Sequence, residues 1–204
     1  MSPSNLKLTF LFFKISTASL ICLVLAVIGW PNVECERKAT FGSKPNNFAT
    51  LDAEIAISSA RVVRLFGFTP KVAFLSHSTF GQPMTSRTKH IRDAVEILKK
   101  MKVDFKFDGD MQPDVALDEK YRELYPLSDI VGRANVLIMP GQHSAAISYK
   151  IMKSMSSSKV IGPLLIGLNA AIEIAPLRCS TSEILNLASV AAYSASVIDY
   201  SKKN

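Results

Sequence analysis

Hydrophobic and polar residues change their pattern along the chain near residue 48. Residues 8–13 are apolar, Lys14 interrupts them, and the sixteen residues 15–30 carry no charge. A membrane-spanning helix needs about 20 apolar residues, so this run is short for one. With Lys7 and Lys14 before it, the run is typical of a signal-peptide core with a cleavage site near Cys35. An uncleaved membrane anchor over residues 8–30 and an apolar leader without a targeting role stay open.

The segments that follow predict a linker and then one globular domain. Residues 36–47 are polar and contain Gly42 and Pro45, which indicates a linker between a leader helix at 1–35 and a domain at 48–204. Helical spacing in the domain alternates with short apolar runs. Helices are expected at 51–66, 87–101, 114–124, 144–155 and 180–198, and strands at 72–75, 103–107, 136–139, 164–166 and 171–174. This alternation predicts an α/β fold of three αβα layers with a mostly parallel sheet, whose ligands bind at the carboxyl ends of its strands.

Composition excludes several classes of function. The net charge of +7 is spread along the chain among carboxylates, without interleaved aromatic residues, so nucleic-acid binding is not expected. A basic surface is suited to steering anionic ligands. The three cysteines, Cys22, Cys35 and Cys179, have neither disulfide-framework nor zinc-site spacing, and Cys179 is expected to pack as a small hydrophobic residue.

Three loops that follow predicted strands are candidate sites: residues 76–81, 108–110 and 140–144. The first has small hydroxyl residues and a glycine, and such a loop can hold a phosphate or a carbonyl oxygen. An ordinary capped strand-to-helix loop is the alternative, because no lysine follows at the position that a P-loop requires.

Carboxylates cluster in the second loop. Asp108, Asp110 and Asp114 have the chemistry to bind a divalent cation or to share a proton. The alternative is a tight turn at Gly109 followed by a helix start, where the helix dipole favours an aspartate. EF-hand spacing is absent, and no metal site is predicted.

Five ordered sequence blocks resemble one known family. Residues 108–117 (D-G-D-M-Q-P-D-V-A-L) and 132–140 (G-R-A-N-V-L-I-M-P) resemble the D-G-E-M-Q-x-D-x-A-L and G-x-A-N-V-L-x-x-P blocks of the phosphate acetyl/butyryl transferase, or phosphotransacetylase, family. Residues 76–81, 148–150 and 162–167 resemble its S-x-S-x-x-G, Y-K and G-P-x-L-x-G blocks. The sequence of these blocks is most similar to that of the domain at the C-terminus of bacterial NADP-dependent malic enzymes. The resemblance covers residues 51–199, roughly the second half of a complete phosphotransacetylase unit.

The resemblance implies a fold, a ligand and a set of contacts. The implied fold is a partial phosphotransacetylase-like domain, related to the isocitrate/isopropylmalate dehydrogenases. The implied ligand is coenzyme A or acetyl-CoA, with no further cofactor. The residues that match the ligand-binding positions are Ser76, Ser78, Thr79, Gly81, Asp108, Asp110, Lys150 and Gly162.

The catalytic positions of the family match less well. The family transfers an acetyl group between coenzyme A and phosphate, with a carboxylate as base and arginines on the phosphate and the carbonyl oxygen. Its base matches Glu183, but its Ser-Arg pair falls on Pro176 and Leu177, and its second arginine falls on Ser154. Proline and leucine side chains donate no hydrogen bond to an oxyanion. The resemblance therefore implies binding of acetyl-CoA with weak or no acyltransferase activity.

Two alternatives stay open at this point: a working acyltransferase, and a non-catalytic remnant that is secreted or membrane-tethered. Expected partners are acetyl-CoA, a second copy of the chain, or a malic-enzyme or phosphotransacetylase partner that supplies the other half of the fold. The apolar leader points to the secretory route or a membrane, whereas the resemblance points to the cytoplasm.

Overall fold

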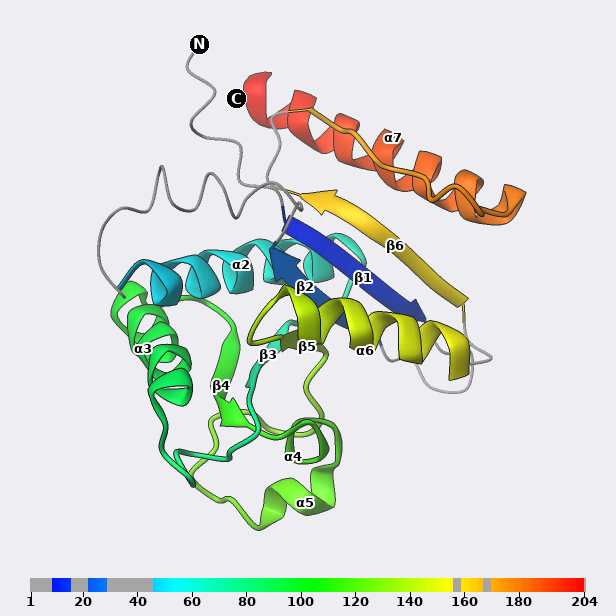
Figure 1. Ribbon diagram of the computed structural model, residues 1–204. Helices are drawn as coiled ribbons and strands as arrows, with labels where there is room; N and C mark the ends of the chain where they lie inside the picture. The colour runs from blue at the N-terminus through cyan, green and yellow to red at the C-terminus, as the bar shows by residue number, and fades with distance from the viewer. Residues whose placement is uncertain (1–8, 16–21, 29–45, 156–158, 167–169, 204) are drawn as a thin grey trace.

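A six-stranded sheet forms the centre of the molecule, with strand order β4-β3-β5-β2-β1-β6 (Figure 1). The structure is a computed structural model that describes residues 9–15, 22–28, 46–155, 159–166 and 170–203. Its strands are β1 (Thr9–Ile15), β2 (Cys22–Ile28), β3 (Lys71–Leu75), β4 (Lys106–Met111), β5 (Val136–Ile138) and β6 (Lys159–Ile166). Strands β4, β3, β5 and β2 are parallel, and β1 is antiparallel to both of its neighbours.

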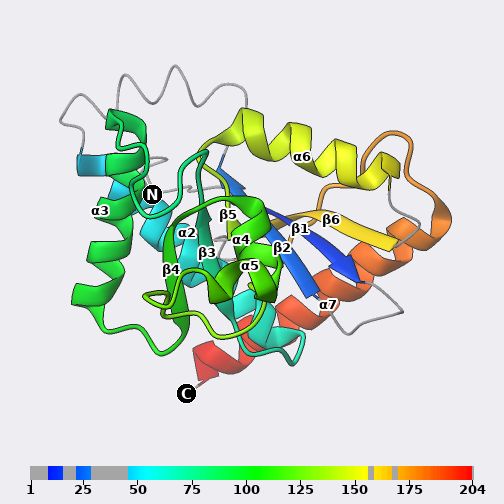
Figure 2. The ribbon, with the colours of Figure 1, turned by 90° about the horizontal axis from the view of Figure 1, so that it is seen from below.

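Helices cover both faces of this sheet. They are α2 (Asn46–Leu65), α3 (Ser86–Met101), α4 (Pro113–Leu117), α5 (Glu119–Glu123), α6 (Gln142–Met155) and α7 (Thr181–Lys203). Seen from below, α6 and α7 lie on opposite sides of β1, β2 and β6 (Figure 2). The predicted three-layer αβα arrangement is confirmed.

Alternate residues of β3 separate two apolar cores. Val72 and Phe74 belong to the core under α2 and α3, whereas Ala73 and Leu75 belong to the core under α4. Successive side chains of a strand point to opposite faces, so one buried strand contributes to both layers. This double burial explains why β3 is an apolar run and not an alternating one.

The prediction of a leader helix at residues 1–35 is wrong for the residues of this range that the structure describes. Residues 9–15 and 22–28 are strands, and β2 pairs with β5 while β1 pairs with β2 and β6. A short apolar run suits a buried strand as well as the core of a leader, and periodicity alone does not separate the two. Within the described part of the chain, no helix is long and apolar enough to cross a membrane. Signal peptide and anchor thus have no support there, while the cleavage site and the linker at 36–47 lie mostly outside the described residues.

Three other predicted elements differ from the structure. The strand expected at 103–107 is β4 at Lys106–Met111, so Asp108 and Asp110 lie in a strand and not in a loop. The helix expected at 114–124 divides at Asp118, which caps the start of α5 by accepting a hydrogen bond from the Lys120 N–H at 2.9 Å. Residues 171–174 form no strand, because the Glu173 side chain accepts the Leu165 N–H at 2.9 Å in place of a neighbouring backbone carbonyl.

Gly109 is required by the close approach of β4 to β3. A Cβ atom at this position would lie 2.6 Å from Phe74 Cβ and 2.8 Å from the Phe74 carbonyl oxygen, at φ +153°. We expect Gly109→Ala to lower the free energy of unfolding by about 1–3 kcal/mol, measured by urea denaturation. Gly141→Ala is the control, because its Cβ would meet nothing within 4 Å. Equal midpoints for both variants would contradict this account.

A half-buried acid–histidine pair joins α2 to α3 and predicts a pH-dependent stability. Asp52 Oδ2 lies 3.8 Å from His90 Nε2, and burial raises the pKa of Asp52 to about 7. Because the unfolded chain releases this proton near its ordinary pKa, stability falls as the pH rises toward 7. Burial lowers the pKa of His90, which acts in the opposite direction, and the Asp93 charge partly offsets that effect.

We therefore expect Asp52→Asn to raise the urea midpoint relative to the natural chain at pH 8, with a much smaller difference at pH 3, which lies below the ordinary pKa of 3.8, so that the carboxyl is largely protonated in both states. Glu96→Gln is the control, because this carboxyl is exposed on α3. A midpoint difference of the same size at both pH values would refute the role of the Asp52 charge.

Candidate functional site

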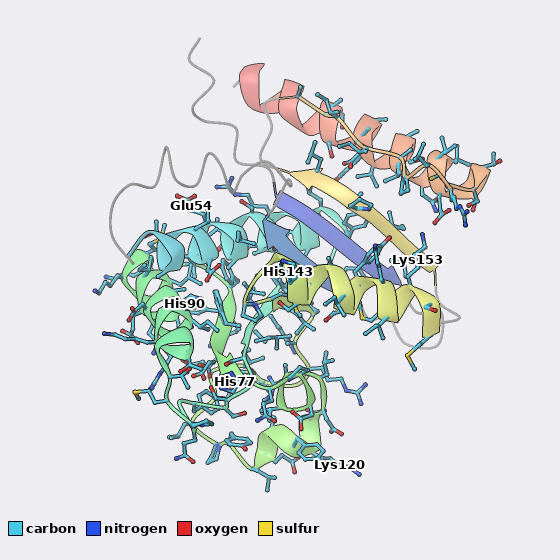
Figure 3. The ribbon with its side chains drawn as sticks, viewed as in Figure 1. Glu54, His77, His90, Lys120, His143 and Lys153 are labelled. Carbon is cyan, nitrogen blue, oxygen red and sulfur yellow. The ribbon has the colours of Figure 1, made fainter. Side chains whose placement is uncertain are left out.

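Six of the predicted site residues meet where β3 and β4 end. The two strands are parallel and paired, so the loop after β3 lies beside the last residues of β4 (Figure 3). The residues gathered there are Ser76, Ser78, Thr79, Gly81, Asp108 and Asp110. All of them except Gly81 are buried. The fold thus brings these six positions together at one end of the sheet, and their role in binding stays a prediction.

Asp110 is the centre of this group. Its side chain is 0% exposed, and its Oδ2 accepts a hydrogen bond from the Ser78 hydroxyl. Its carbonyl oxygen accepts the Phe80 N–H at 2.7 Å, and the Ser78 Oγ lies 3.2 Å from the Ser76 Oγ. Side chain and backbone of one residue thus hold the loop after β3 against the end of β4.

Arg92 of α3 supplies the positive charge near this carboxylate. Asp110 Oδ1 accepts no hydrogen bond from the described residues, but Arg92 Nε lies 4.0 Å away. The guanidinium lies against Gly81: a Cβ there would be 2.5 Å from Arg92 Nη1, at φ +82°. Buried charge is costly unless it is paired, which explains why a cation stands here. Sequence reasoning missed Arg92 because it belongs to an ordinary amphipathic helix and to no motif.

The other hydroxyl and acid of the group have structural partners. Thr79 Oγ1 accepts the Gln112 N–H at 3.3 Å, which ties the loop to the start of α4. Asp108 accepts the Gly109 N–H at 2.8 Å through Oδ1 and the Asp129 N–H at 2.9 Å through Oδ2. Both Asp108 oxygens therefore serve to anchor backbone.

A second buried cation, Arg122, stabilises the same end of the molecule. Its guanidinium donates hydrogen bonds to the carbonyls of Val115, Ala116 and Ile130. Burial lowers the pKa of Arg122, and the nearby Asp108 charge partly offsets that effect. Across the described residues, no three His, Cys, Asp or Glu side chains are close enough to hold a metal ion.

The remaining predicted residues lie elsewhere. Lys150 is exposed on α6, and the Gly162 carbonyl in β6 accepts a hydrogen bond from the Tyr149 hydroxyl at 3.3 Å. Glu183 is at the start of α7 and pairs with Lys153, which lies far across the molecule from His77 (Figure 3). The structure does not bring these residues together with the Asp110 group.

Glu183 is occupied by local contacts. Its Oε1 accepts a hydrogen bond from Lys153 Nζ at 2.8 Å, and its Oε2 accepts the Ser180 N–H at 2.8 Å. The Ser180 hydroxyl in turn accepts the Glu183 N–H at 3.3 Å, so the predicted capping box at 180–183 is confirmed. The hydrogen bond from Lys153, together with those from Ser180, lowers the pKa of Glu183 to about 2. A carboxylate with so low a pKa is a weak proton acceptor, which disfavours Glu183 as a general base.

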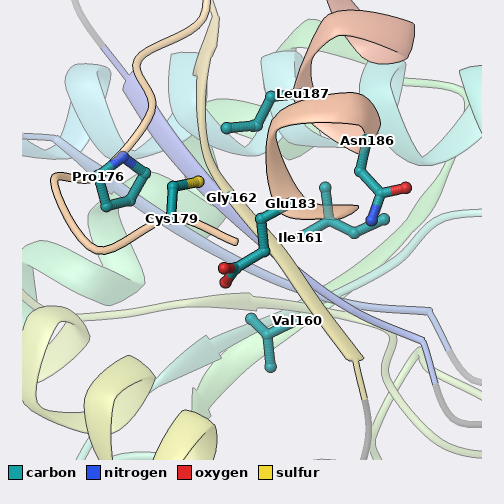
Figure 4. A pocket seen from close by; sticks show the side chains of 8 residues that line it. All are labelled: Val160, Ile161, Gly162, Pro176, Cys179, Glu183, Asn186 and Leu187. Atoms are coloured by element: carbon teal, nitrogen blue, oxygen red, sulfur yellow. The ribbon is translucent and has the colours of Figure 1, made fainter. Parts of the chain in front are cut away.

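The two residues matched to the family's Ser-Arg pair, Pro176 and Leu177, have no side-chain hydrogen-bond donor for a substrate. Pro176 lines a cavity of only ≈ 10 Å³ together with Gly162, Cys179 and Glu183 (Figure 4), which leaves room for about one water molecule. The side chain of Leu177 is fully exposed. Cys179 packs against the apolar core under α2 and α3, as its sequence context predicted.

Comparison with known proteins agrees with the fold and with the motifs. The profile of the family "Phosphate acetyl/butaryl transferase" matches residues 43–192. The chain is 46% identical over 143 residues to the NADP-dependent malic enzyme of Rhizobium meliloti. The aligned region covers 70% of this chain and 19% of that protein. It is 36% identical over 148 residues to the phosphate acetyltransferase of Clostridium acetobutylicum. That alignment covers 72% of this chain and 44% of that protein.

Solved structures show the same similarity. The EutD phosphotransacetylase from Staphylococcus aureus superposes with a TM-score of 0.76 at 26% identity, over 95% of this chain and 56% of that chain. A phosphotransacetylase from Streptococcus pyogenes superposes with a TM-score of 0.74 at 28% identity, over 95% and 55%. The chain thus spans only part of the length of the relatives that it matches. With most of its length matched by the family profile, the chain belongs to the phosphate acetyl/butaryl transferase family.

Proposed function

We propose that this chain is a phosphate acetyltransferase-like domain of the malic-enzyme-tail type that binds coenzyme A or acetyl-CoA and has weak or no acyltransferase activity. The observation that carries the proposal is the contrast between two ends of the molecule. The Asp110 group keeps a cation, hydroxyls and a glycine loop together, whereas Pro176 and Leu177 replace the family's Ser-Arg pair.

The Asp110 group has the chemistry of an anion site. Coenzyme A carries a diphosphate and a ribose phosphate, and a guanidinium that forks onto phosphate oxygens is a strong and geometrically specific donor. The Arg92 side chain is partly exposed. Its Nε lies near the Asp110 carboxylate, and the absence of a side chain at Gly81 leaves space for its Nη1. We assign the phosphate-binding role to Arg92 with the loop at 76–81, the buried Asp110 acting as the residue that positions the guanidinium.

The weak or absent catalysis is inferred from the other end of the molecule, where Pro176, Leu177 and Glu183 lie. An acyl transfer needs donors where the oxyanion develops, and removing one such donor costs about 100- to 1,000-fold in rate. Neither Pro176 nor Leu177 supplies a side-chain donor, and Glu183 is paired with Lys153. Binding without turnover is the chemistry that remains.

Calorimetric titration of the full chain with coenzyme A tests the binding site. We expect Arg92→Gln to weaken binding about tenfold or more, since a hydrogen bond to a charged group contributes roughly 1.5–3 kcal/mol. Arg92→Lys should restore part of the affinity, and Arg61→Ala, at an exposed arginine of α2, should leave it unchanged. The urea midpoint of each variant separates loss of binding from loss of folding. No binding by the natural chain would overturn the proposal.

The catalytic part is tested by thiol release from acetyl-CoA in the presence of phosphate. We expect release at the uncatalysed rate, because the matched oxyanion donors are replaced. Restoring the family's pair by Pro176→Ser with Leu177→Arg is the informative comparison. A rate well above background for the natural chain would instead establish a working acyltransferase.

We further propose that the chain associates with a second copy through an apolar patch at the start of α7. The patch consists of Leu177, Ile184 and Leu185, all exposed. Exposed apolar patches of this kind mark interfaces. Light scattering at micromolar concentration should report a dimer, and Leu185→Lys with Ile184→Lys should shift it to monomer. A monodisperse monomer for the natural chain would eliminate this assembly.

A further inference from the structure

A cleft lies between α2 and α7 over the edge strand β6, away from the Asp110 group. Its volume is ≈ 370 Å³, within the range of about 300–1,000 Å³ that small-molecule sites occupy. Helix α7 runs beside β6 at the edge of the sheet (Figure 1). We call this space the α2–α7 cleft; the lining residues that matter below are Val62, Phe66, Leu164, Glu173, Val190 and Tyr193.

The walls of the cleft are apolar on three sides. Val62 and Phe66 come from α2, Leu164 from β6, and Val190 from α7. Val62 and Leu164 belong to the buried core, and Phe66 and Val190 pack against it, so the walls are held by the fold. Such walls exclude water and favour a hydrocarbon of matching length, because burying apolar surface is favourable.

One carboxyl group faces this apolar space. Glu173 Oε2 accepts the Leu165 N–H at 2.9 Å, which fixes the side chain in place. Burial raises the pKa of Glu173 to about 7, as expected for a carboxyl that is desolvated without a cation beside it. Among the residues that line the cleft there is no lysine, arginine or histidine.

Hydroxyl groups also line the cleft. Ser189 and Ser194 line the cleft from α7. The Ser189 Oγ donates its proton to the Leu185 carbonyl at 2.8 Å, which leaves its lone pairs as acceptors. The Tyr193 and Ser194 hydroxyls can donate or accept, so Glu173 is the one lining side chain that can carry a charge, and no lining cation pairs with it.

We propose that the α2–α7 cleft binds a small amphiphile with an apolar tail and a protonated primary amine. The tail lies against Val62, Leu164 and Val190, and the ammonium group donates to Glu173. An ammonium ion carries a positive charge and three donors, which complements a half-buried carboxyl that has no cation among the lining residues. A carboxylate head would meet the Glu173 charge, and a neutral head would leave that carboxyl without a counter-ion.

The test is a calorimetric titration of the full chain with three probes of equal tail length at pH 8: octylamine, octanol and octanoate. We expect octylamine to bind with a stoichiometry of one, octanol about tenfold or more weakly, and octanoate not at all. The Glu173→Gln variant should bind octylamine about tenfold more weakly than the natural chain while its octanol affinity stays unchanged. Glu123→Gln, at an exposed carboxyl of α5, should change neither.

Two measurements keep the proposal falsifiable if Glu173→Gln alters the fold. Val190→Phe places a larger side chain in the cleft and should abolish binding of both octylamine and octanol, with the urea midpoint as the check on folding. Light scattering during the titration reports whether the cleft is instead an interface between copies. Equal affinities for the three probes, unchanged octylamine binding by Glu173→Gln, or a ligand-driven change of oligomeric state would each overturn the proposal.

Discussion

A buried negative charge at the end of β4 governs the arrangement of one whole end of this molecule. The Asp110 side chain is fully buried, and an isolated carboxylate in such a place would be strongly destabilising. Ser78 donates to one oxygen and Arg92 approaches the other, so three separate segments are drawn to one point. Two glycines follow from the same packing: Gly109 lets β4 approach β3, and Gly81 leaves space for the guanidinium.

At the opposite end of the molecule, an ion pair joins two helices. Lys153 on α6 and Glu183 on α7 bond to each other at 2.8 Å, and Glu183 also caps its own helix. These contacts hold α7 in position and depress the basicity of the carboxylate. A side chain that is committed to a cap and an ion pair is poorly suited to accept a proton from a thiol. The proposed binding site and the positions matched to the catalytic pair therefore lie at different ends of the molecule, with Arg92 beside the loop at 76–81 and Pro176 and Leu177 near the start of α7.

Helix α7 connects the two proposals made for this chain, self-association and a ligand in the α2–α7 cleft. The solved relatives extend well beyond the matched region, since the chain covers 56% of the Staphylococcus aureus structure. Ile184, Leu185 and Tyr193 of α7 stay exposed, so the helix has apolar surface beyond the face that packs on the sheet. In this chain β6 contacts one face of α7, the α2–α7 cleft opens beside it, and Leu185 stays exposed. Both the proposed self-association and the proposed ligand derive from that incomplete coverage.

The sequence by itself determined the features that depend on local patterns. Alternating helical and apolar segments predicted the αβα layers; β3, β5, α3 and the Ser180–Glu183 capping box lie where their patterns placed them. The ordered motifs predicted the family, because their order and spacing are properties of the sequence and do not depend on tertiary contacts.

Tertiary structure decided everything that depends on which segments meet. Residues 9–15 and 22–28 have the composition of a leader, and pairing with β5 and β6, more than 100 residues away, makes them strands. Arg92 belongs to an ordinary helix until the fold brings it within 4.0 Å of Asp110. Glu173 is expected in a strand by its neighbours, and becomes a half-buried acceptor only because β6 presents the Leu165 N–H to it. In each case a charge or a backbone group gains its partner from another element of the fold, and the pattern of residues within one element does not show which element that will be.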